Sequence, residues 1–167
     1  MGLKLHLGCG NDIKPGYINV DEFSAGAQLR AAIQDLDFPD NSVECIEAYM
    51  VLEHLSPENA SRFANNAYRM LEDNGRLTLE CPDLEKVARL ILAFADDPAE
   101  LDEGPFGLRG IFGEPTPAMT IGDYHKWGYT PSSATRLLEN AGFRRIVVSD
   151  GTSHGMPIRD MRIEALK

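Results

Sequence analysis

Glycines and acidic residues follow three successive apolar segments near the N-terminus, where they could hold a nucleoside. Gly8-Cys9-Gly10 lets the backbone turn sharply and approach a ligand closely, because glycine has no side chain. Asp21 stands at the end of the second segment, where an acid can accept hydrogen bonds from both hydroxyls of a ribose. Asp35 could accept from an exocyclic amine such as that of adenine, with Leu36 packing on the base. A lone Gly-x-Gly is a weak signal, whereas a glycine turn and two acids at three strand ends are more specific.

The elements that must position these residues alternate between strands and helices. Strands are predicted from apolar alternation and short apolar runs at residues 3–7, 17–20, 31–34, 43–48, 76–81, 143–149 and 161–166. Helices are predicted to begin after the caps Ser56, Asp83 and Thr130, each followed by apolar residues at helical spacing. This alternation implies an α/β fold with helices on both faces of a mainly parallel sheet. The last two strands, joined without a helix, imply an antiparallel pair at one edge.

The 167 residues fit a single domain over 1–167, and the composition is that of an ordinary globular protein, 43% hydrophobic and 25% charged. No apolar run approaches the roughly 20 residues of a membrane span, and no signal peptide is predicted. The net charge of −10 makes nucleic acid and anionic lipid poor partners. Three widely spaced cysteines indicate reduced thiols in a cytoplasmic protein. Residues 96–128 carry four prolines and no helical period, so we predict a long loop that could act as an active-site lid.

Several short motifs follow one another in the order found in one enzyme family. They are His6-Leu7-Gly8-Cys9-Gly10, Ile18-Asn19-Val20-Asp21, the segment 35–42, Val51-Leu52-Glu53-His54-Leu55, and Arg69-Met70-Leu71 before Gly75. The series resembles the class I S-adenosylmethionine-dependent methyltransferases, most closely the small methyltransferase-11-like branch. The resemblance implies a Rossmann-like, doubly wound sheet of seven strands in the order 3-2-1-4-5-7-6, mostly parallel, with an antiparallel last strand. Asp12 replaces the third glycine that the family often has, and Ile13 breaks the dinucleotide pattern, which argues against a nicotinamide oxidoreductase.

The resemblance also implies a cofactor, S-adenosylmethionine, with S-adenosylhomocysteine as its product. The cofactor-binding residues that it implies are Leu7, Gly8, Cys9, Gly10, Asp21, Asp35, Leu36, Tyr49 and Met50. The glycine loop would hold the methionine part, Asp21 the ribose, and Asp35 with Leu36 the adenine. Tyr49 and Met50 would line the floor of the pocket near the sulfonium, where an aromatic surround suits a cation.

Candidates for a catalytic base lie in the segment 123–129, after the long loop. A base assists methyl transfer when the acceptor is a hydroxyl or a protonated amine. His125 is the strongest candidate because an imidazole titrates near neutral pH, and Tyr124 stands beside it. Alternatively, this segment packs the loop onto the sheet and His125 is structural; His54 likewise is either a turn residue or a substrate-facing group. No histidine or cysteine pair has the spacing of metal ligands, so no metal site is predicted.

Two functions from different classes are compatible with these patterns. The first is S-adenosylmethionine-dependent methyl transfer to a small-molecule or sugar-like acceptor. The second is a catalytically inactive, methyltransferase-like module that binds the cofactor or a partner, and a loop 96–128 folded over the cofactor would favour the first. A homodimer formed through the final edge strand is left open, because Arg159, Arg162 and Lys167 could equally protect that edge.

Overall fold

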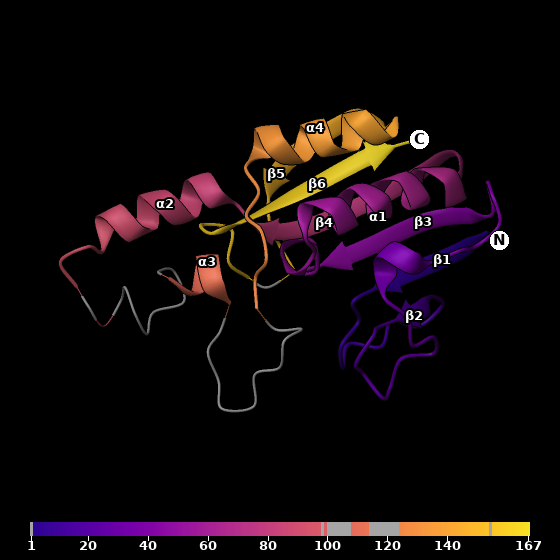
Figure 1. Ribbon diagram of the computed structural model, residues 1–167, viewed down its shortest axis with the longest axis horizontal. Helices are drawn as coiled ribbons and strands as arrows, with labels where there is room; N and C mark the ends of the chain where they lie inside the picture. The colour runs from indigo at the N-terminus through magenta and orange to yellow at the C-terminus, as the bar shows by residue number, and fades with distance from the viewer. Residues whose placement is uncertain (1, 98, 100–107, 114–123, 154) are drawn as a thin grey trace.

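The computed structural model describes residues 2–97, 99, 108–113, 124–153 and 155–167, whose strands form one sheet in the order β2-β1-β3-β4-β6-β5 (Figure 1). The strands are β1 (Leu3–Leu7), β2 (Ile18–Val20), β3 (Val43–Tyr49), β4 (Leu71–Pro82), β5 (Arg144–Asp150) and β6 (Asp160–Leu166). β2, β1, β3 and β4 run parallel, and β6 runs antiparallel to both of its neighbours. The Rossmann-like sheet and its antiparallel last strand are therefore confirmed.

The predicted third strand at residues 31–34 is wrong, so the described sheet has six strands rather than seven. After β2 the chain forms only an isolated bridge between Leu29 and Val20, and it then enters the 3-10 helix η1 (Ile33–Asp35). The amides of Gln28 and Leu29 both donate to the carbonyl of Asn19, which holds the chain beside β2 for only a short distance. The two alanines that follow have little preference for a pleated strand. β2 consequently forms one edge of the sheet.

The helices after the caps Ser56, Asp83 and Thr130 begin where predicted, whereas one short helix without a side-chain cap lies within the predicted loop 96–128. The helices are α1 (Pro57–Met70), α2 (Leu84–Ala93), α3 (Arg109–Phe112) and α4 (Pro131–Ala141), with the 3-10 helix η2 (Leu52–His54) after β3. Ser56 accepts from the amide of Asn59, and Thr130 forms a reciprocal capping box with Ser133. α1 and α4 lie over the same face of the sheet, whereas α2 and α3 extend beyond the carboxyl end of β4 (Figure 1). Residues 98, 100–107 and 114–123 of the predicted lid are outside the described part of the chain.

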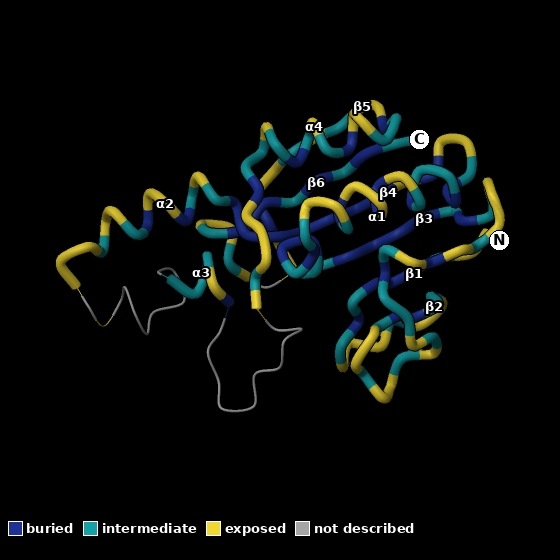
Figure 2. The backbone as a smooth tube through the Cα atoms, in the orientation of Figure 1, coloured by how far each residue is buried: buried dark blue, intermediate teal, exposed yellow. Residues whose placement is uncertain are grey.

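The two faces of the sheet differ in chemistry, which a fully doubly wound sheet would not show. Toward α1 and α4 the strands present buried apolar residues such as Leu7, Ile46 and Leu79. In Figure 2 much of β3 and β4 is dark blue, the colour of buried residues. Several alternate positions of the same strands are buried but polar, among them His6, Glu47 and Thr78. Glu47 accepts hydrogen bonds from Lys14 and from Tyr17 (2.8 Å), so loop side chains cover this face where the fold prediction places helices.

The final strand is not an edge of the sheet, contrary to the expectation on which a homodimer was considered. β6 lies between β4 and β5, and its Arg162 donates to the buried carboxylate of Glu80 at 2.8 Å. The exposed edge on this side is β5, whose pairing with β6 is irregular near Arg145, a residue with a φ of +51°. None of the described helices is long and apolar enough to cross a membrane.

Candidate functional site

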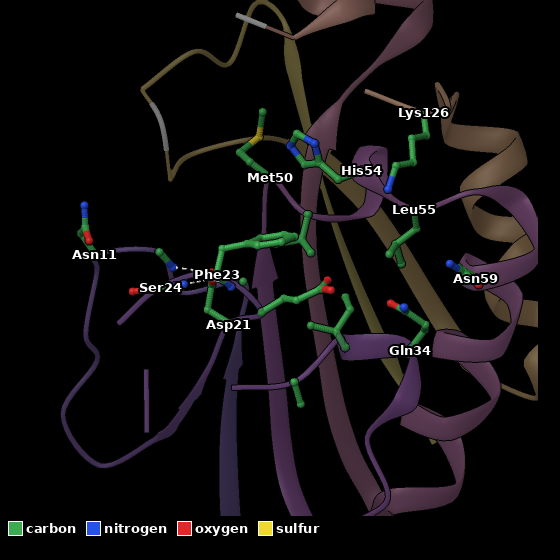
Figure 3. Close-up of a pocket in the computed structure, with 16 residues that line it drawn as sticks. Asn11, Asp21, Phe23, Ser24, Gln34, Met50, His54, Leu55, Asn59 and Lys126 are labelled. Carbon is green, nitrogen blue, oxygen red and sulfur yellow. Dashed lines mark hydrogen bonds between the residues drawn. The ribbon is translucent and has the colours of Figure 1, made fainter. Parts of the chain in front are cut away.

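A pocket of about 560 Å³ lies at the carboxyl ends of β1, β2 and β3. The direction of the strand order reverses here, between β1 and β3, which is where open α/β sheets bind their ligands. Figure 3 shows Asp21 and Phe23 from the end of β2 facing Met50 and His54, with Gln34 and Asn59 on the side of η1 and α1. The pocket thus draws on the ends of β1 and β2 that the sequence singled out, and on η1 in place of the predicted third strand.

The glycine turn after β1 forms one wall of the pocket, and its two glycines are required for different reasons. Gly8 has a φ of +64°, and a Cβ there would lie 2.1 Å from the Val51 side chain. Gly10 has a φ of +50°, but a Cβ there would meet no atom within 4 Å. Packing therefore excludes a side chain at Gly8, whereas Gly10 faces open pocket space and is constrained by its left-handed backbone.

The Asp21 carboxylate ties the glycine turn to the loop after β2. Its Oδ2 atom accepts from the Gly10 amide at 2.9 Å, and its Oδ1 atom accepts from the amides of Phe23 (2.8 Å) and Ser24 (2.7 Å). These amides orient the carboxylate at the pocket wall. Each carboxylate oxygen has about two lone-pair sites, so Oδ2 can still accept one hydrogen bond from a ligand hydroxyl.

Some of the predicted cofactor residues line the pocket and others lie outside it. Gly8, Gly10, Asp21 and Met50 line the pocket together. Five others do not line it. Leu7, Cys9 and Leu36 are buried. The Tyr49 hydroxyl donates to Glu47 (2.9 Å), and Asp35 pairs with Arg62 (3.2 Å). The roles of these residues stay predictions.

Several pocket residues lie outside the set predicted from the sequence. Phe23 has an exposed fraction of 64% and a ring directed across the pocket in Figure 3. Gln34 lines the pocket one residue before Asp35, and Lys126 reaches it from beyond the long loop. An aromatic residue two positions after a strand-end acid is a usable signal, whereas the approach of Lys126 depends on tertiary packing alone.

A second pocket of about 290 Å³ adjoins the first, and Lys126 lines both. Its walls include the apolar side chains of Leu84, Phe112 and Trp127, together with Glu53 and His125. The segment that carries His125 is fixed to η2, because the amides of Lys126 (2.8 Å) and Trp127 (3.2 Å) both donate to the Glu53 carbonyl. Tyr124, the other predicted catalytic residue, is half exposed and is not among the lining residues of either pocket.

His125 and His54 face each other across the boundary between the two pockets. Their ring centroids are 5.0 Å apart and their planes are inclined by 80°. Burial, followed by repulsion from His54, lowers the pKa of His125 to about 4. The imidazole is therefore uncharged at neutral pH and is a weaker base than the near-neutral titration assumed from the sequence.

Glu53 carries the most unusual carboxylate of this region. It is 2% exposed, and neither of its oxygens has a hydrogen-bond partner among the described residues. Burial raises the pKa of this carboxyl group to about 8. In the sequence, Glu53 stands out only as part of the motif at residues 51–55. Nothing in its neighbours along the chain indicates that its carboxyl group is buried without a hydrogen-bond partner.

The comparisons with known proteins agree with the fold. Residues 5–79 match the family model described as a methyltransferase domain. No curated protein sequence matches the chain. Its fold is similar to that of a SAM-dependent methyltransferase from Archaeoglobus fulgidus, with a TM-score of 0.65 at 15% identity over 99% of this chain and 86% of that one.

Two further solved structures share the fold at similarly low identity. A SAM-dependent methyltransferase from Methanosarcina mazei has a TM-score of 0.65 at 20% identity, covering 99% of this chain and 92% of that one. The 1,6-didemethyltoxoflavin-N1-methyltransferase of Burkholderia thailandensis, with bound 1,6-didemethyltoxoflavin and S-adenosylhomocysteine, has a TM-score of 0.63 at 14% identity, covering 99% and 71%. The chain therefore has the fold of SAM-dependent methyltransferases, and its residues 5–79 match the methyltransferase-domain family model.

Proposed function

We propose that this protein transfers a methyl group from S-adenosylmethionine to a small-molecule acceptor. The observation that carries the proposal is the pocket at the ends of β1, β2 and β3, which is lined by Gly8, Gly10 and Asp21 and lies largely within the matched residues 5–79. A structural neighbour from Burkholderia thailandensis binds S-adenosylhomocysteine and 1,6-didemethyltoxoflavin, which supports both parts of the proposal by analogy.

The residues present fit such a cofactor. The volume of about 560 Å³ falls within the range of roughly 300–1,000 Å³ that small-molecule sites occupy. Gly10 leaves open space beside the backbone, and the Oδ2 atom of Asp21 keeps one lone-pair site for a ligand hydroxyl. When bound, S-adenosylmethionine would supply an electrophilic methyl group on a sulfonium.

In this proposal each wall of the pocket binds one part of the cofactor. Asp21 accepts from a ribose hydroxyl, and the turn from Gly8 to Gly10 receives the methionine part. The adenine lies against Ile33 and Gln34, which line the pocket beside the predicted Asp35 and Leu36. Met50 forms the floor with a φ of +54°, a rare conformation for a residue with a side chain, and its amide donates to the Glu80 carbonyl at 2.8 Å.

The acceptor is assigned to the second pocket. Lys126 lines both pockets, so a molecule held between Phe112 and Trp127 would lie next to the cofactor site. Holding the two reactants in line supplies much of the rate enhancement in a methyl transfer, because the sulfonium is already a good leaving group. The apolar walls and the volume of about 290 Å³ favour a compact molecule or one ring of a larger one.

Calorimetric titration with S-adenosylhomocysteine tests the proposal. We expect saturable binding by the parent chain and at least about tenfold weaker binding by Asp21→Asn, since a hydrogen bond to a charged group contributes about 1.5–3 kcal/mol. Asp73→Asn, a change at an exposed acid of β4, is the matched control and should bind like the parent. Absence of binding by the parent at millimolar ligand would exclude the proposed function.

A further inference from the structure

Three potential metal ligands come together between the two pockets. Glu53, His54 and His125 each contribute one donor atom, and these atoms all lie within 4.8 Å of one another. His54 lines the first pocket, whereas Glu53 and His125 line the second. Glu53 and His54 belong to η2, and His125 is brought to them by the backbone bonds between the Glu53 carbonyl and the amides that follow His125.

Hydrogen bonds to the backbone fix how both imidazoles carry their protons. The Nδ1 atom of His54 lies 3.1 Å from the Tyr124 carbonyl, and that of His125 lies 3.2 Å from the Gly110 carbonyl. A carbonyl only accepts, so each Nδ1 must carry a proton, which makes Nε2 the lone-pair nitrogen of each neutral ring. Metal-binding histidines use this same arrangement, in which the non-ligating N–H donates to a backbone carbonyl.

The Glu53 carboxylate supplies the negative charge that a cation site needs. Within the described residues it has no hydrogen-bond partner although it is buried, and a buried carboxylate without partners is unfavourable. The neighbouring buried acid, Asp160, is already neutralised by Arg159, whose guanidinium donates to it at 2.6 and 3.0 Å. A bound cation would therefore act on Glu53 itself, by giving its oxygens a ligating partner.

We propose that Glu53, His54 and His125 form a binding site for a divalent transition-metal ion of the zinc, iron or cobalt class. Two imidazoles and one carboxylate suit these ions, whereas Mg²⁺ and Ca²⁺ require mostly oxygen ligands. Ligand bonds of about 2.0–2.2 Å require the three side chains to move closer together around the ion. The remaining coordination positions face the pockets, where water or the methyl acceptor can occupy them. Binding of the ion does not depend on the proposed function. Only a role of the ion in contacting the methyl acceptor rests on the proposed function.

Titration of the chelator-treated protein with Co²⁺, followed by visible absorption, tests the site directly. We expect one Co²⁺ per chain, displacement by Zn²⁺, and no thiolate-to-cobalt band, because none of the three proposed ligands is a cysteine. Glu53→Gln and His125→Ala should each weaken binding by at least about 100-fold, which exceeds the effect of losing an outer partner. Glu139→Gln, the same type of change at an exposed position of α4, should leave the affinity unchanged.

A second variant keeps the test decisive if Glu53→Gln fails to fold. His125→Cys replaces one ligand by another, so it should retain Co²⁺ and gain a thiolate-to-cobalt charge-transfer band. Equal Co²⁺ affinities of the parent and His125→Ala, or a thiolate band in the parent, would overturn the assignment. Calorimetry with S-adenosylhomocysteine on the same samples separates the two proposals. Binding of that ligand without a Co²⁺ site refutes only the metal site, and the reverse refutes only the proposed function.

Discussion

Replacing Gly10 by alanine isolates the contribution of the glycine turn to ligand binding. The added Cβ would meet no atom within 4 Å, so the substitution introduces no clash inside the protein. It instead places a methyl group in the open space of the proposed cofactor pocket, on a residue with a φ of +50°. The amide of residue 10 remains, and with it the hydrogen bond to Asp21 at 2.9 Å.

Two separate magnitudes follow from this geometry. The left-handed backbone costs an alanine roughly 1–2 kcal/mol. The reduced entropy of the unfolded chain returns about 0.4–1 kcal/mol, so the free energy of unfolding should fall by only about 1 kcal/mol. That loss corresponds to a decrease of about 2–4 °C in Tm for a chain of this size. A methyl group intruding on a fitted ligand costs about 1–3 kcal/mol, or about 5- to 150-fold in Kd.

Gly16→Ala is the matched control for this experiment. Gly16 has a φ of +81°, a Cβ there would also meet no atom within 4 Å, and Gly16 does not line the pocket. Both variants should show similar decreases in Tm by calorimetry, but only Gly10→Ala should lose affinity for S-adenosylhomocysteine. If the two variants bind this ligand equally well, the turn does not receive the cofactor and the reasoning is refuted.

Three further outcomes are expected. Gly8→Ala should destabilise the fold far more than Gly10→Ala, because its Cβ would overlap Val51; equal Tm values for the two would contradict the packing argument. Phe63→Ala should lower the free energy of unfolding by about 3–5 kcal/mol in urea, since the ring is fully buried, and a loss below about 1 kcal/mol would refute its place in the core. Burial opposes ionisation of Glu47, but hydrogen bonds from Lys14 and two tyrosines outweigh it and keep the pKa of Glu47 below its usual value. Glu47→Gln should therefore cost about 1–3 kcal/mol at neutral pH. This difference from the parent should shrink as the pH falls below about 4.3, and a pH-independent difference would be the contrary result.

Sequence signals located the elements of this fold well where they were local. Ser56, Asp83 and Thr130 each cap the helix predicted to follow, because a side-chain oxygen beside the first turn satisfies amides that have no partner within the helix. The prediction of a strand at residues 31–34 is wrong. Its apolar residues are typical of a short strand, but the chain leaves β2 after the bridge at Leu29. Short apolar runs do not specify strand or turn by themselves.

The candidate site was predictable only where it follows the chain direction. Glycines and acids at the ends of parallel strands converge at one edge of a sheet, and Gly10 and Asp21 do so here. The sequence did not indicate which of the adjacent residues Gln34 and Asp35 lines the pocket. The turn of η1 directs Gln34 toward the pocket and leaves Asp35 paired with Arg62. The meeting of His54 with His125 could not be seen from spacing, since tertiary packing joins residues from distant segments.

The pocket also depends on how this chain organises the segment between β1 and β2 without a helix. Asn19 of β2 accepts from the Lys14 amide at 2.8 Å and donates to the Lys14 carbonyl at 3.0 Å, and the Lys14 side chain then reaches Glu47. Asp21 fixes the start of the same segment through Gly10. Hydrogen bonds and one ion pair thus hold the pocket wall where helix packing would otherwise do so. Such bonds contribute only about 0.5–3 kcal/mol each, so the wall should open locally at lower free energy than the core beneath α1.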